Sequence, residues 1–344
     1  MAARAFITGL LGLTITSEER AFLRAADPWG LILFKRNISS AAQVASVVDD
    51  FRMALGRAEA PVLIDQEGGR VQRLGPPLWP AYPAGAAYGR LYGRDQAHGL
   101  AAARLGGRLI AADLAALRIT VDCLPLADVP APGADPVIGD RAYGRTPATV
   151  AALAEAIALG LQEGGVLPVL KHLPGHGRAT ADSHLKLPVV DADRATLEAT
   201  DFAAFRPLAG LPMGMTAHVV FTAFDPDLPA TSSATMISEV IRGFIGFDGL
   251  LMSDDVSMGA LSGSIAQRTQ QALAAGCDVV LHCNGRLAEM EQVASAAPPL
   301  AGEAARRAAV ALAARKAAKP IDLPSARAEF ARMMAGVANT EVTV

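Results

Sequence analysis

The sequence predicts a single (β/α)8 barrel followed by a helical C-terminal tail. The chain has 344 residues, which is the size of one large α/β domain. Hydrophobic residues make up 51% of it and charged residues 19%, so the chain can fill a large core. Short apolar runs alternate with alanine- and leucine-rich amphipathic stretches. This alternation is typical of parallel α/β folds, and eight repeats of it favour a barrel.

Eight short apolar runs are the predicted strands. Each is four to six residues long, is bounded by turn residues and shows little alternation between apolar and polar residues. Strands buried on both faces have this pattern. The runs cover residues 6–10, 30–34, 61–65, 119–123, 166–171, 213–218, 250–253 and 279–282.

The stretches between these runs include predicted helices at 41–55, 95–117, 147–163 and 265–275. Thr146 can cap the third of them, and Pro147 suits its first position. An open doubly wound sheet would give the same alternation. No G-x-G-x-x-G follows any predicted strand, which argues against the dinucleotide-binding form of that sheet. We predict a barrel domain over 1–295 and a helical extension over 296–344 that packs on the outside of the barrel.

Composition excludes several classes of function. The net charge is −3 and no basic run is long enough to follow a phosphate backbone, so nucleic-acid binding is not expected. Three cysteines (Cys123, Cys277 and Cys283) without C-x-x-C spacing argue against a disulfide scaffold or a zinc ribbon. Glycine, proline and histidine interrupt the longest uncharged stretch, 207–224, and the uncharged segment 5–17 has no signal-peptide cleavage site. We expect a cytoplasmic monomer without membrane segments, bound metal or cofactor.

Polar residues recur where the predicted strands end. Asp65 follows the third run, Lys171 and His172 the fifth, His218 the sixth, and 253–255 (Ser-Asp-Asp) the seventh. One such residue is usually only a turn former. In a barrel, however, all strand ends meet at the carboxyl face, where active sites lie. Polar residues at the ends of four strands, all at the same mouth of the barrel, therefore predict an enzyme.

The segment 171–184 (KHLPGHGRATADSH) holds three of the six histidines. Its proline and glycines predict a long loop between a strand and a helix. Imidazoles and a carboxylate suit a metal ion, although no H-E-x-x-H is present and helical facing of His172 and His176 fails across the Pro-Gly turn. Alternatively, Asp182 can accept the ring N–H of His184 and make that histidine an acid/base catalyst. Spacing alone leaves both interpretations open.

The segment 65–73 (DQEGGRVQR) also begins at a strand end. Its Gly-Gly allows a close backbone approach, and its carboxylates and guanidinium groups suit bidentate hydrogen bonds to sugar hydroxyls or phosphate. A surface loop of ion pairs would have the same composition. The segment 138–143 (IGDRAY) is a weaker candidate of the same kind.

Six motifs together resemble the β-N-acetylhexosaminidases of glycoside hydrolase family 3, in particular the bacterial cytoplasmic enzymes of muropeptide recycling. They are GLILFKRNI (30–38), IDQEGGRVQRL (64–74), VIGDRAYG (137–144), KHLPGHGRATADSH (171–184), MTAHVVF (215–221) and LLMSDDVSM (250–258). They occur in the family's order across nearly the whole predicted barrel. The resemblance implies a (β/α)8 barrel and a retaining exo-β-N-acetylglucosaminidase that acts on (1,6-anhydro)muropeptides.

The resemblance also assigns roles to residues. It implies Asp254 as the nucleophile, a choice that the sequence alone could not make between Asp254 and Asp255. It implies His184 as the acid/base, coupled to Asp182 on a mobile loop spanning 172–184. The substrate-binding residues that it implies are Asp65, Arg73, Arg141, Lys171 and His172.

The chain departs from the family at Leu173, Arg178 and Ala179, where Phe, Asp and Thr are more usual. None of these is a catalytic position, but Arg178 reverses a charge near the loop and puts loop dynamics and leaving-group preference in question. His176 and His218 receive no role from the resemblance, and we expect His176 to brace the loop. Two alternative functions remain: a phosphorylase that uses the same residues, because a histidine acid/base repels phosphate less than a carboxylate does, and a metal-dependent barrel hydrolase.

Overall fold

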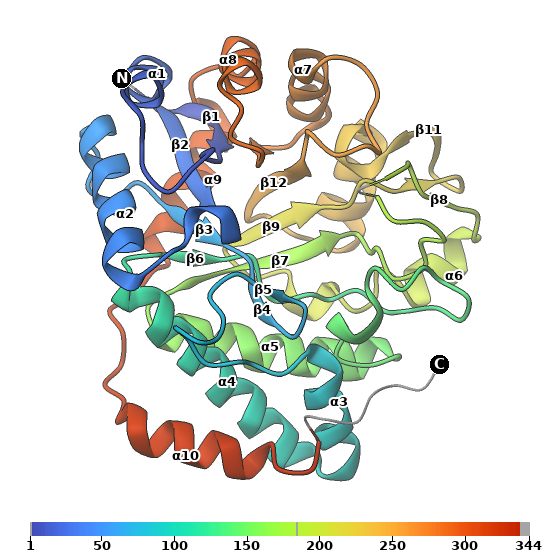
Figure 1. Cartoon of the computed structure of the whole chain (residues 1–344). Coiled ribbons are helices and arrows are strands. Elements are labelled where there is room, and N and C mark those ends of the chain that lie inside the picture. Colours follow the sequence, from blue (N-terminus) through green and yellow to red (C-terminus); the bar gives the residue numbers. More distant parts are fainter. Residues whose placement is uncertain (1, 184, 338–344) are drawn as a thin grey trace.

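Eight parallel strands close into a barrel at the centre of the molecule (Figure 1). The computed structural model describes residues 2–183 and 185–337. The strands follow one another around the barrel in the order β1-β13-β12-β9-β7-β6-β3-β2. Their bounds are β1 Arg4–Thr8, β2 Pro28–Leu33, β3 Val62–Ile64, β6 Val121–Asp122, β7 Leu167–Leu173, β9 Met213–Thr216, β12 Leu250–Asp255 and β13 Val279–His282. The predicted fold and all eight predicted strands are confirmed.

One strand boundary corrects the sequence analysis. We expected a loop to begin at His172, but β7 continues to Leu173, so His172 is a strand residue and the loop begins at Pro174. Parallel pairing of Leu173 with Thr216 of β9 extends β7 by these residues. The position of His172 is therefore set by the barrel and not by the loop.

Helices surround the barrel, and side chains cap the amino ends of several of them. Thr146 accepts a hydrogen bond from the backbone N–H of Thr149, and Pro147 occupies the first position of α5, as predicted. The predicted helices 147–163 and 265–275 are confirmed to the residue. The bounds are α1 Ser17–Ala26, α2 Ala41–Leu55, α3 Gly85–Arg94, α4 Gln96–Ala116, α5 Pro147–Glu163, α6 Arg194–Ala199, α7 Ile265–Ala275 and α8 Leu287–Ala296, with a π-helical segment η5 Met236–Phe244 and 3-10 turns η1 Lys35–Asn37, η2 Gly139–Arg141, η3 Arg206–Leu208 and η4 Ala230–Ser232.

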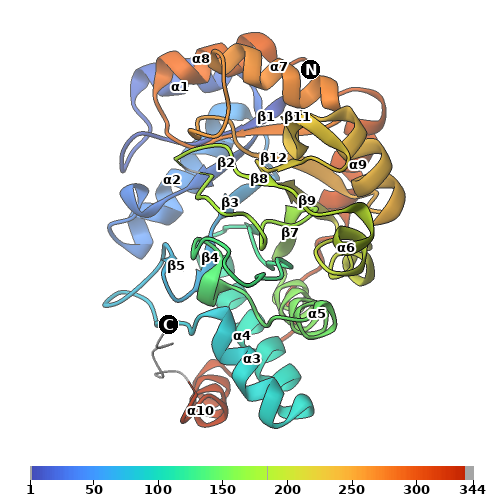
Figure 2. The ribbon, with the colours of Figure 1, turned by 90° about the vertical axis from the view of Figure 1, so that its right-hand side faces the viewer.

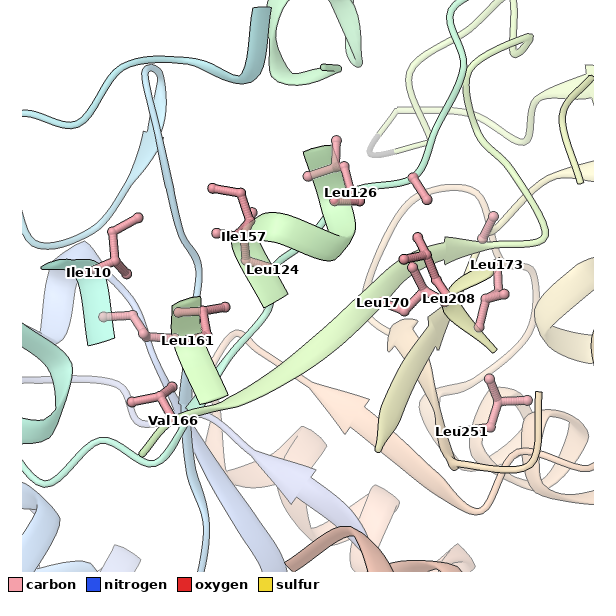
Figure 3. Packing of buried hydrophobic residues seen from close by; sticks show 14 of the residues in the cluster. Ile110, Leu124, Leu126, Ile157, Leu161, Val166, Leu170, Leu173, Leu208 and Leu251 are labelled. Carbon is pink, nitrogen blue, oxygen red and sulfur yellow. The ribbon is translucent and has the colours of Figure 1, made fainter. Parts of the chain in front are cut away.

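The core has two parts. Side chains such as Ile7, Val169 and Met215 fill the interior of the barrel, and a larger cluster lies between the strands and the helices. Figure 3 shows part of that larger cluster, in which Leu161 of α5 and Leu170 of β7 are labelled. Burial of these apolar side chains is the main stabilising contribution to such a fold.

The two C-terminal helices pack against the amino end and one side of this structure. Helix α9 (Gly302–Ala313) contributes Ala308 to the cluster inside the barrel, and Arg307 of the same helix pairs with Asp278 at the amino end of β13. Helix α9 therefore covers the amino end of the barrel. Helix α10 (Leu323–Met333) lies against α4 on the side of the molecule (Figure 1).

The carboxyl ends of the strands face the viewer in Figure 2. Two small sheets lie at this mouth: a hairpin of β4 (Gln66–Gly68) and β5 (Val71–Gln72), and a three-stranded sheet of β8 (Val189–Val190), β10 (Val220–Phe221) and β11 (Asp225–Pro229). Within the described residues, no helix is long and apolar enough to cross a membrane.

Candidate active site

A cavity of about 440 Å³ opens at the carboxyl end of the barrel. Pockets of this size are typical of small-molecule sites. All of the expected site residues that the structure describes line it: Asp65, Arg73, Arg141, Lys171, His172, Asp182 and Asp254. The expected acid/base, His184, lies outside the described residues. The barrel thus gathers side chains that lie up to 189 positions apart in the sequence.

A cluster of buried ion pairs forms one wall of the cavity, and we call it the ion-pair cluster (Asp65, Glu67, Arg73, Arg141 and Lys171). Lys171 Nζ lies 3.0 Å from Asp65 Oδ1 and 2.6 Å from Glu67 Oε1. Arg141 donates two hydrogen bonds to Glu67, at 2.9 and 2.8 Å, and Arg73 donates one to Asp65 at 2.9 Å. Three cations thus share two carboxylates.

The electrostatics of this cluster keep its members charged. Burial alone would raise the pKa of Glu67, but the neighbouring Arg141 and Lys171 outweigh burial and lower the pKa to about 2. The same balance holds the pKa of Asp65 well below its usual range, where Lys171 and Arg73 outweigh burial. Burial would lower the pKa of Lys171, yet Asp65 and Glu67 raise it. Charged groups fixed in this way are available to a polar ligand without first having to be ordered.

His172 is oriented from behind by a buried aspartate. Its Nδ1 lies 2.7 Å from Asp128 Oδ2, which leaves Nε2 as the ring nitrogen not engaged by that carboxylate. Burial would raise the pKa of Asp128, but His172 outweighs burial and lowers it. Asp128 also accepts a hydrogen bond of 2.6 Å from the backbone N–H of His176. A single carboxylate thereby ties the end of β7 to the beginning of the following loop.

The two adjacent aspartates at the end of β12 have different partners. Asp255 accepts three hydrogen bonds from protein groups: from Ser257 N–H at 2.9 Å, from Ser257 Oγ at 2.6 Å and from Cys283 N–H at 3.1 Å. Its carboxylate therefore fastens two loops. Asp254 Oδ1 accepts a hydrogen bond of 2.7 Å from the backbone N–H of Asp255, and the side chain lines the cavity.

Comparison with known proteins is consistent with this geometry. Residues 7–312 match the glycosyl hydrolase family 3 N-terminal domain. The chain belongs to glycoside hydrolase family 3. It is 41% identical over 280 residues to a β-hexosaminidase of Alkalilimnicola ehrlichii, covering 80% of this chain and 79% of that protein. A β-hexosaminidase of Aromatoleum aromaticum is 36% identical over 302 residues, which cover 86% and 83% of the two chains.

Solved structures show the same family. Native NagZ from Neisseria gonorrhoeae superposes with a TM-score of 0.85 at 31% identity, over 98% of both chains. The same NagZ in complex with N-trifluoroacetyl-D-glucosamine gives a TM-score of 0.84 at 30% identity, again over 98% of both chains. The resemblance stated above is confirmed, and with it the enzyme class, a β-N-acetylhexosaminidase.

In this family 3 enzyme a chain of hydrogen bonds lies behind the two aspartates, and we call it the histidine relay (Thr216, Thr231 and His218). His218 Nε2 lies 3.0 Å from the backbone carbonyl of Asp255, which can only accept, so Nε2 carries the proton. Nδ1 then accepts from Thr231 Oγ1 at 2.7 Å, and Thr231 accepts from Thr216 at 2.7 Å. Burial keeps the pKa of His218 below its usual range, which agrees with a neutral ring. The relay therefore fixes the position of the backbone carbonyl of Asp255, next to Asp254.

Several hydrogen bonds hold the loop that leads to the expected acid/base, among them one between two of its own side chains. His176 Nε2 lies 2.9 Å from Ser183 Oγ, and burial lowers the pKa of His176 to about 4, so the ring is neutral near pH 7. This contact fits the expected bracing role of His176. Arg178, the departure from the family pattern, donates hydrogen bonds to Asp201 at 3.0 and 2.8 Å and to Thr200 at 3.1 Å. Its charge is therefore paired beside the loop.

Sequence reasoning assigned no role to three residues that the site depends on: Glu67, Asp128 and His218, although His218 had been placed at a strand end. Glu67 lies in a segment that we had singled out, but nothing in the sequence shows that it bonds to both Arg141 and Lys171. Asp128 lies five residues beyond its predicted strand, where no strand-end rule would find it. Within residues 2–183 and 185–337, no three His, Cys, Asp or Glu side chains are grouped so as to hold a metal ion.

Proposed function

We propose that this enzyme removes non-reducing terminal N-acetylglucosamine from peptidoglycan-derived (1,6-anhydro)muropeptides in the cytoplasm, as a step in cell-wall recycling. Configuration at the anomeric carbon is retained. Asp254 is the nucleophile, and His184 with Asp182 is the acid/base. The observation that supports this proposal is a single cavity lined by Asp254, Asp182 and the ion-pair cluster.

The first step forms a bond between Asp254 and the sugar. The Asp254 carboxylate attacks the anomeric carbon while His184 gives its proton to the departing glycosidic oxygen, through an oxocarbenium-like transition state. Of the two adjacent aspartates, Asp255 is the less suited to attack because Ser257 and Cys283 already occupy its carboxylate. The product of this step is a covalent glycosyl-enzyme and a free leaving group.

The second step releases the sugar. His184, now without its proton, accepts one from water, and that water attacks the anomeric carbon and breaks the bond to Asp254. Asp182 positions the histidine and stabilises its charged form. The ion-pair cluster binds the sugar hydroxyls throughout: its charged groups are already fixed, so ordering them costs little when the substrate binds. The relatives named above are hexosaminidases, which favours water over phosphate as the acceptor.

The experiment is hydrolysis of an aryl β-N-acetylglucosaminide by wild type and Asp254→Ala, with a chelator present. We expect release of the aryl group by wild type and loss of at least about 1,000-fold in the variant, as for the removal of other covalent nucleophiles. Asp248→Asn is the control, because Asp248 lies at the amino end of the barrel with 63% of its side chain exposed. Proton NMR of the fresh product gives the stereochemistry.

Three results would contradict parts of this proposal. Wild-type turnover by Asp254→Ala would remove the nucleophile assignment, and an α-anomer as the first product would remove the retaining mechanism. Loss of wild-type activity on adding the chelator would favour a metal-dependent hydrolase. Formation of sugar 1-phosphate in phosphate buffer would favour the phosphorylase.

A further inference from the structure

A cavity of about 230 Å³ lies at the amino end of the barrel, opposite the candidate active site. Its walls come from the segments that lead into β3, β6 and β7, from the ends of α2 and α4, and from the segment that follows α9. We call it the arginine cavity, because Arg52, Arg118 and Arg315 line it. None of its lining residues lines the catalytic cavity.

Arg52 is partly buried at the end of α2. Its Nε donates to the backbone carbonyl of Ala60 and its Nη2 to that of Arg118, each at 3.1 Å. These bonds fix the guanidinium group and occupy two carbonyls that would otherwise repel an anion. Nη1 makes no hydrogen bond with a described residue, so one side of this fixed group stays available.

Arg118 and Arg315 have more unused donors. Arg118 donates to Asp49 through Nη1, while its Nε and Nη2 make no hydrogen bond within the described part of the chain. Nη1 of Arg315 lies 3.6 Å from Glu59 Oε2, which is an ion pair but is too long for a hydrogen bond. No other described residue bonds to the guanidinium group of Arg315. All three arginines can therefore donate to a ligand.

The charged groups around Arg52 leave the cavity positive. Those that affect its pKa are two cations, Arg118 and Arg315, and two carboxylates, Asp49 and Glu59. Burial lowers the pKa of Arg52 most, and the two cations lower it further. Counting Arg52, three positive charges face two negative ones. The side chains of Asp49 and Glu59 are 49% and 80% exposed, so solvent screens the negative charges.

A buried hydroxyl adds a further donor. Thr120 lines the cavity and is only 8% exposed. Its Oγ1 accepts a hydrogen bond of 3.2 Å from the backbone N–H of Val62, and none of the described residues accepts the hydroxyl proton. Glu59 is the one carboxylate among the lining residues. The lining is thus rich in N–H and O–H donors and poor in acceptors.

Helix ends explain only part of this arrangement. The carboxyl end of a helix favours cations, because its last carbonyls carry partial negative charge. Arg52 takes this role by bonding to backbone carbonyls. The guanidinium groups of Arg118 and Arg315 bond to no described carbonyl, although both residues follow helix ends. Their position beside a third cation is what an anion site requires.

We propose that the arginine cavity binds a small tetrahedral dianion, either inorganic phosphate or the phosphate group of a metabolite. Guanidinium groups match the oxygens of phosphate, which accept hydrogen bonds on every side. The volume of about 230 Å³ is below the range of about 300–1,000 Å³ that is typical of pockets enclosing larger ligands, so it suits an ion. A bound anion joins the ends of α2 and α4 to the segment after α9. Phosphate binding at this end does not depend on the function proposed above.

The test is isothermal titration calorimetry with inorganic phosphate, at an ionic strength held constant with chloride. For wild type we expect a Kd of about 1 mM, and Arg118→Gln and Arg315→Gln each raise it about tenfold, because a charge-assisted hydrogen bond is lost. Glu59→Gln acts in the opposite direction and lowers Kd about threefold, because it removes the carboxylate from the lining. Phosphate bound in the catalytic cavity would respond to none of these substitutions.

A hexose 6-phosphate is the second probe and distinguishes the two sources of the phosphate group. Tighter binding than that of inorganic phosphate identifies a phosphorylated metabolite as the ligand. Equal or weaker binding identifies the free ion. Both probes respond to Arg118→Gln and Arg315→Gln in the same way, because both place a phosphate group in the arginine cavity.

Arg24→Gln is the matched control, because Arg24 is an exposed arginine in the last turn of α1 and does not line the cavity. It changes the net charge equally and leaves Kd unchanged. Circular dichroism like that of wild type shows that each variant is folded. Absence of phosphate binding by wild type would overturn the proposal, and so would one Kd shared by wild type, Arg315→Gln and Glu59→Gln. Either result leaves the proposed function untouched.

Discussion

Replacing Glu67 with Gln tests whether the ion-pair cluster organises the sugar site. Glu67 Oε1 forms an ion pair with Lys171 Nζ at 2.6 Å and accepts a hydrogen bond from Arg141 at 2.8 Å, and Oε2 accepts from Arg141 Nε at 2.9 Å. Glutamine has only one acceptor oxygen, and its amide nitrogen would face an N–H donor of Arg141 or Lys171. Glu67→Gln therefore removes a buried negative charge and at least one charge-assisted hydrogen bond.

Two independent arguments give the same value for the free energy of unfolding that Glu67→Gln loses. Breaking a buried ion pair by removing one partner costs about 3–5 kcal/mol. The pKa of Glu67 is lowered from its ordinary 4.5 to about 2, which at about 1.4 kcal/mol per pKa unit corresponds to about 3 kcal/mol. Lys171 keeps its second partner, Asp65, at 3.0 Å, which limits the loss. We expect Glu67→Gln to lower the free energy of unfolding by about 3 kcal/mol.

The sign of the pH dependence follows from the direction of the shift. A carboxyl whose pKa is depressed in the folded state stabilises the protein above its unfolded pKa and loses that contribution as the pH falls. The difference between wild type and Glu67→Gln, measured by urea unfolding, is therefore full near pH 7 and shrinks from about pH 4.5 down to pH 2. Because Arg141 then loses at least one of its two hydrogen bonds to residue 67 and is held less firmly, KM for the aryl glycoside rises about tenfold.

Glu303→Gln is the control for this prediction. Glu303 pairs with Arg306 at 2.8 Å on the surface, with 65% of its side chain exposed. Such surface pairs contribute at most about 1 kcal/mol to the free energy of unfolding. We therefore expect Glu303→Gln to shift the midpoint of urea unfolding only slightly and to leave KM unchanged. If Glu67→Gln matched Glu303→Gln in stability at pH 7 and in KM, the cluster would not organise the site and the reasoning would be wrong.

Three further substitutions, the first with a control of its own, test other parts of the molecule. Gly160→Ala places a Cβ 2.2 Å from the backbone oxygen of Arg104 where α5 crosses α4, so we expect a loss of about 3 kcal/mol in thermal unfolding. Gly93→Ala meets no atom within 4 Å and stays neutral or slightly stabilising, and equal effects of the two would refute the packing argument. Thr231→Val removes the hydroxyl that lies 2.7 Å from His218 Nδ1 and so breaks the histidine relay. A buried ring nitrogen without a donor lowers the free energy of unfolding by about 1–3 kcal/mol. An unchanged midpoint of urea unfolding would speak against the relay. Asp255→Asn weakens the three hydrogen bonds that Asp255 accepts and lowers kcat. Mass spectrometry still detects the covalent glycosyl-enzyme in this variant, whereas Asp254→Ala cannot form it. If Asp255→Asn formed no glycosyl-enzyme, the roles assigned to Asp254 and Asp255 would be reversed.

Much of the fold could be predicted because its signals are local. The apolar run 279–282 is β13 without any change of bounds, and the capping residues of α5 and α7 mark where those helices begin. The ends of the strands are harder to predict from sequence, because pairing with a neighbouring strand determines where each strand ends. Segment 119–123 forms only the short strand β6 (Val121–Asp122), while β7 gains two residues through its pairing with β9.

The site was predictable wherever strand ends carried polar residues, and it was not where side chains meet across the cavity. Asp65 and Lys171 could each be placed at the barrel mouth from sequence, but their 3.0 Å contact joins positions 106 residues apart. The difference between Asp254 and Asp255 depends on Cys283, which lies on another strand's loop. Such partners appear only when the barrel closes, so no spacing rule in the chain could have supplied them.

The cavity is built from side chains that are fixed by ion pairs and from a loop that is fastened by hydrogen bonds. Side chains that would bind the sugar are fixed by ion pairs, with Lys171 only 2% exposed, before any ligand arrives. Asp182 lies on a loop that is fastened by the His176–Ser183 hydrogen bond of 2.9 Å and by backbone hydrogen bonds that Gly177, Ala179 and Ser183 accept from other segments. Substitutions in the ion-pair cluster should therefore act mainly on KM, because they disorganise binding. His176→Ala or Ser183→Ala should act mainly on kcat, because the acid/base must still be held in place after the sugar is bound.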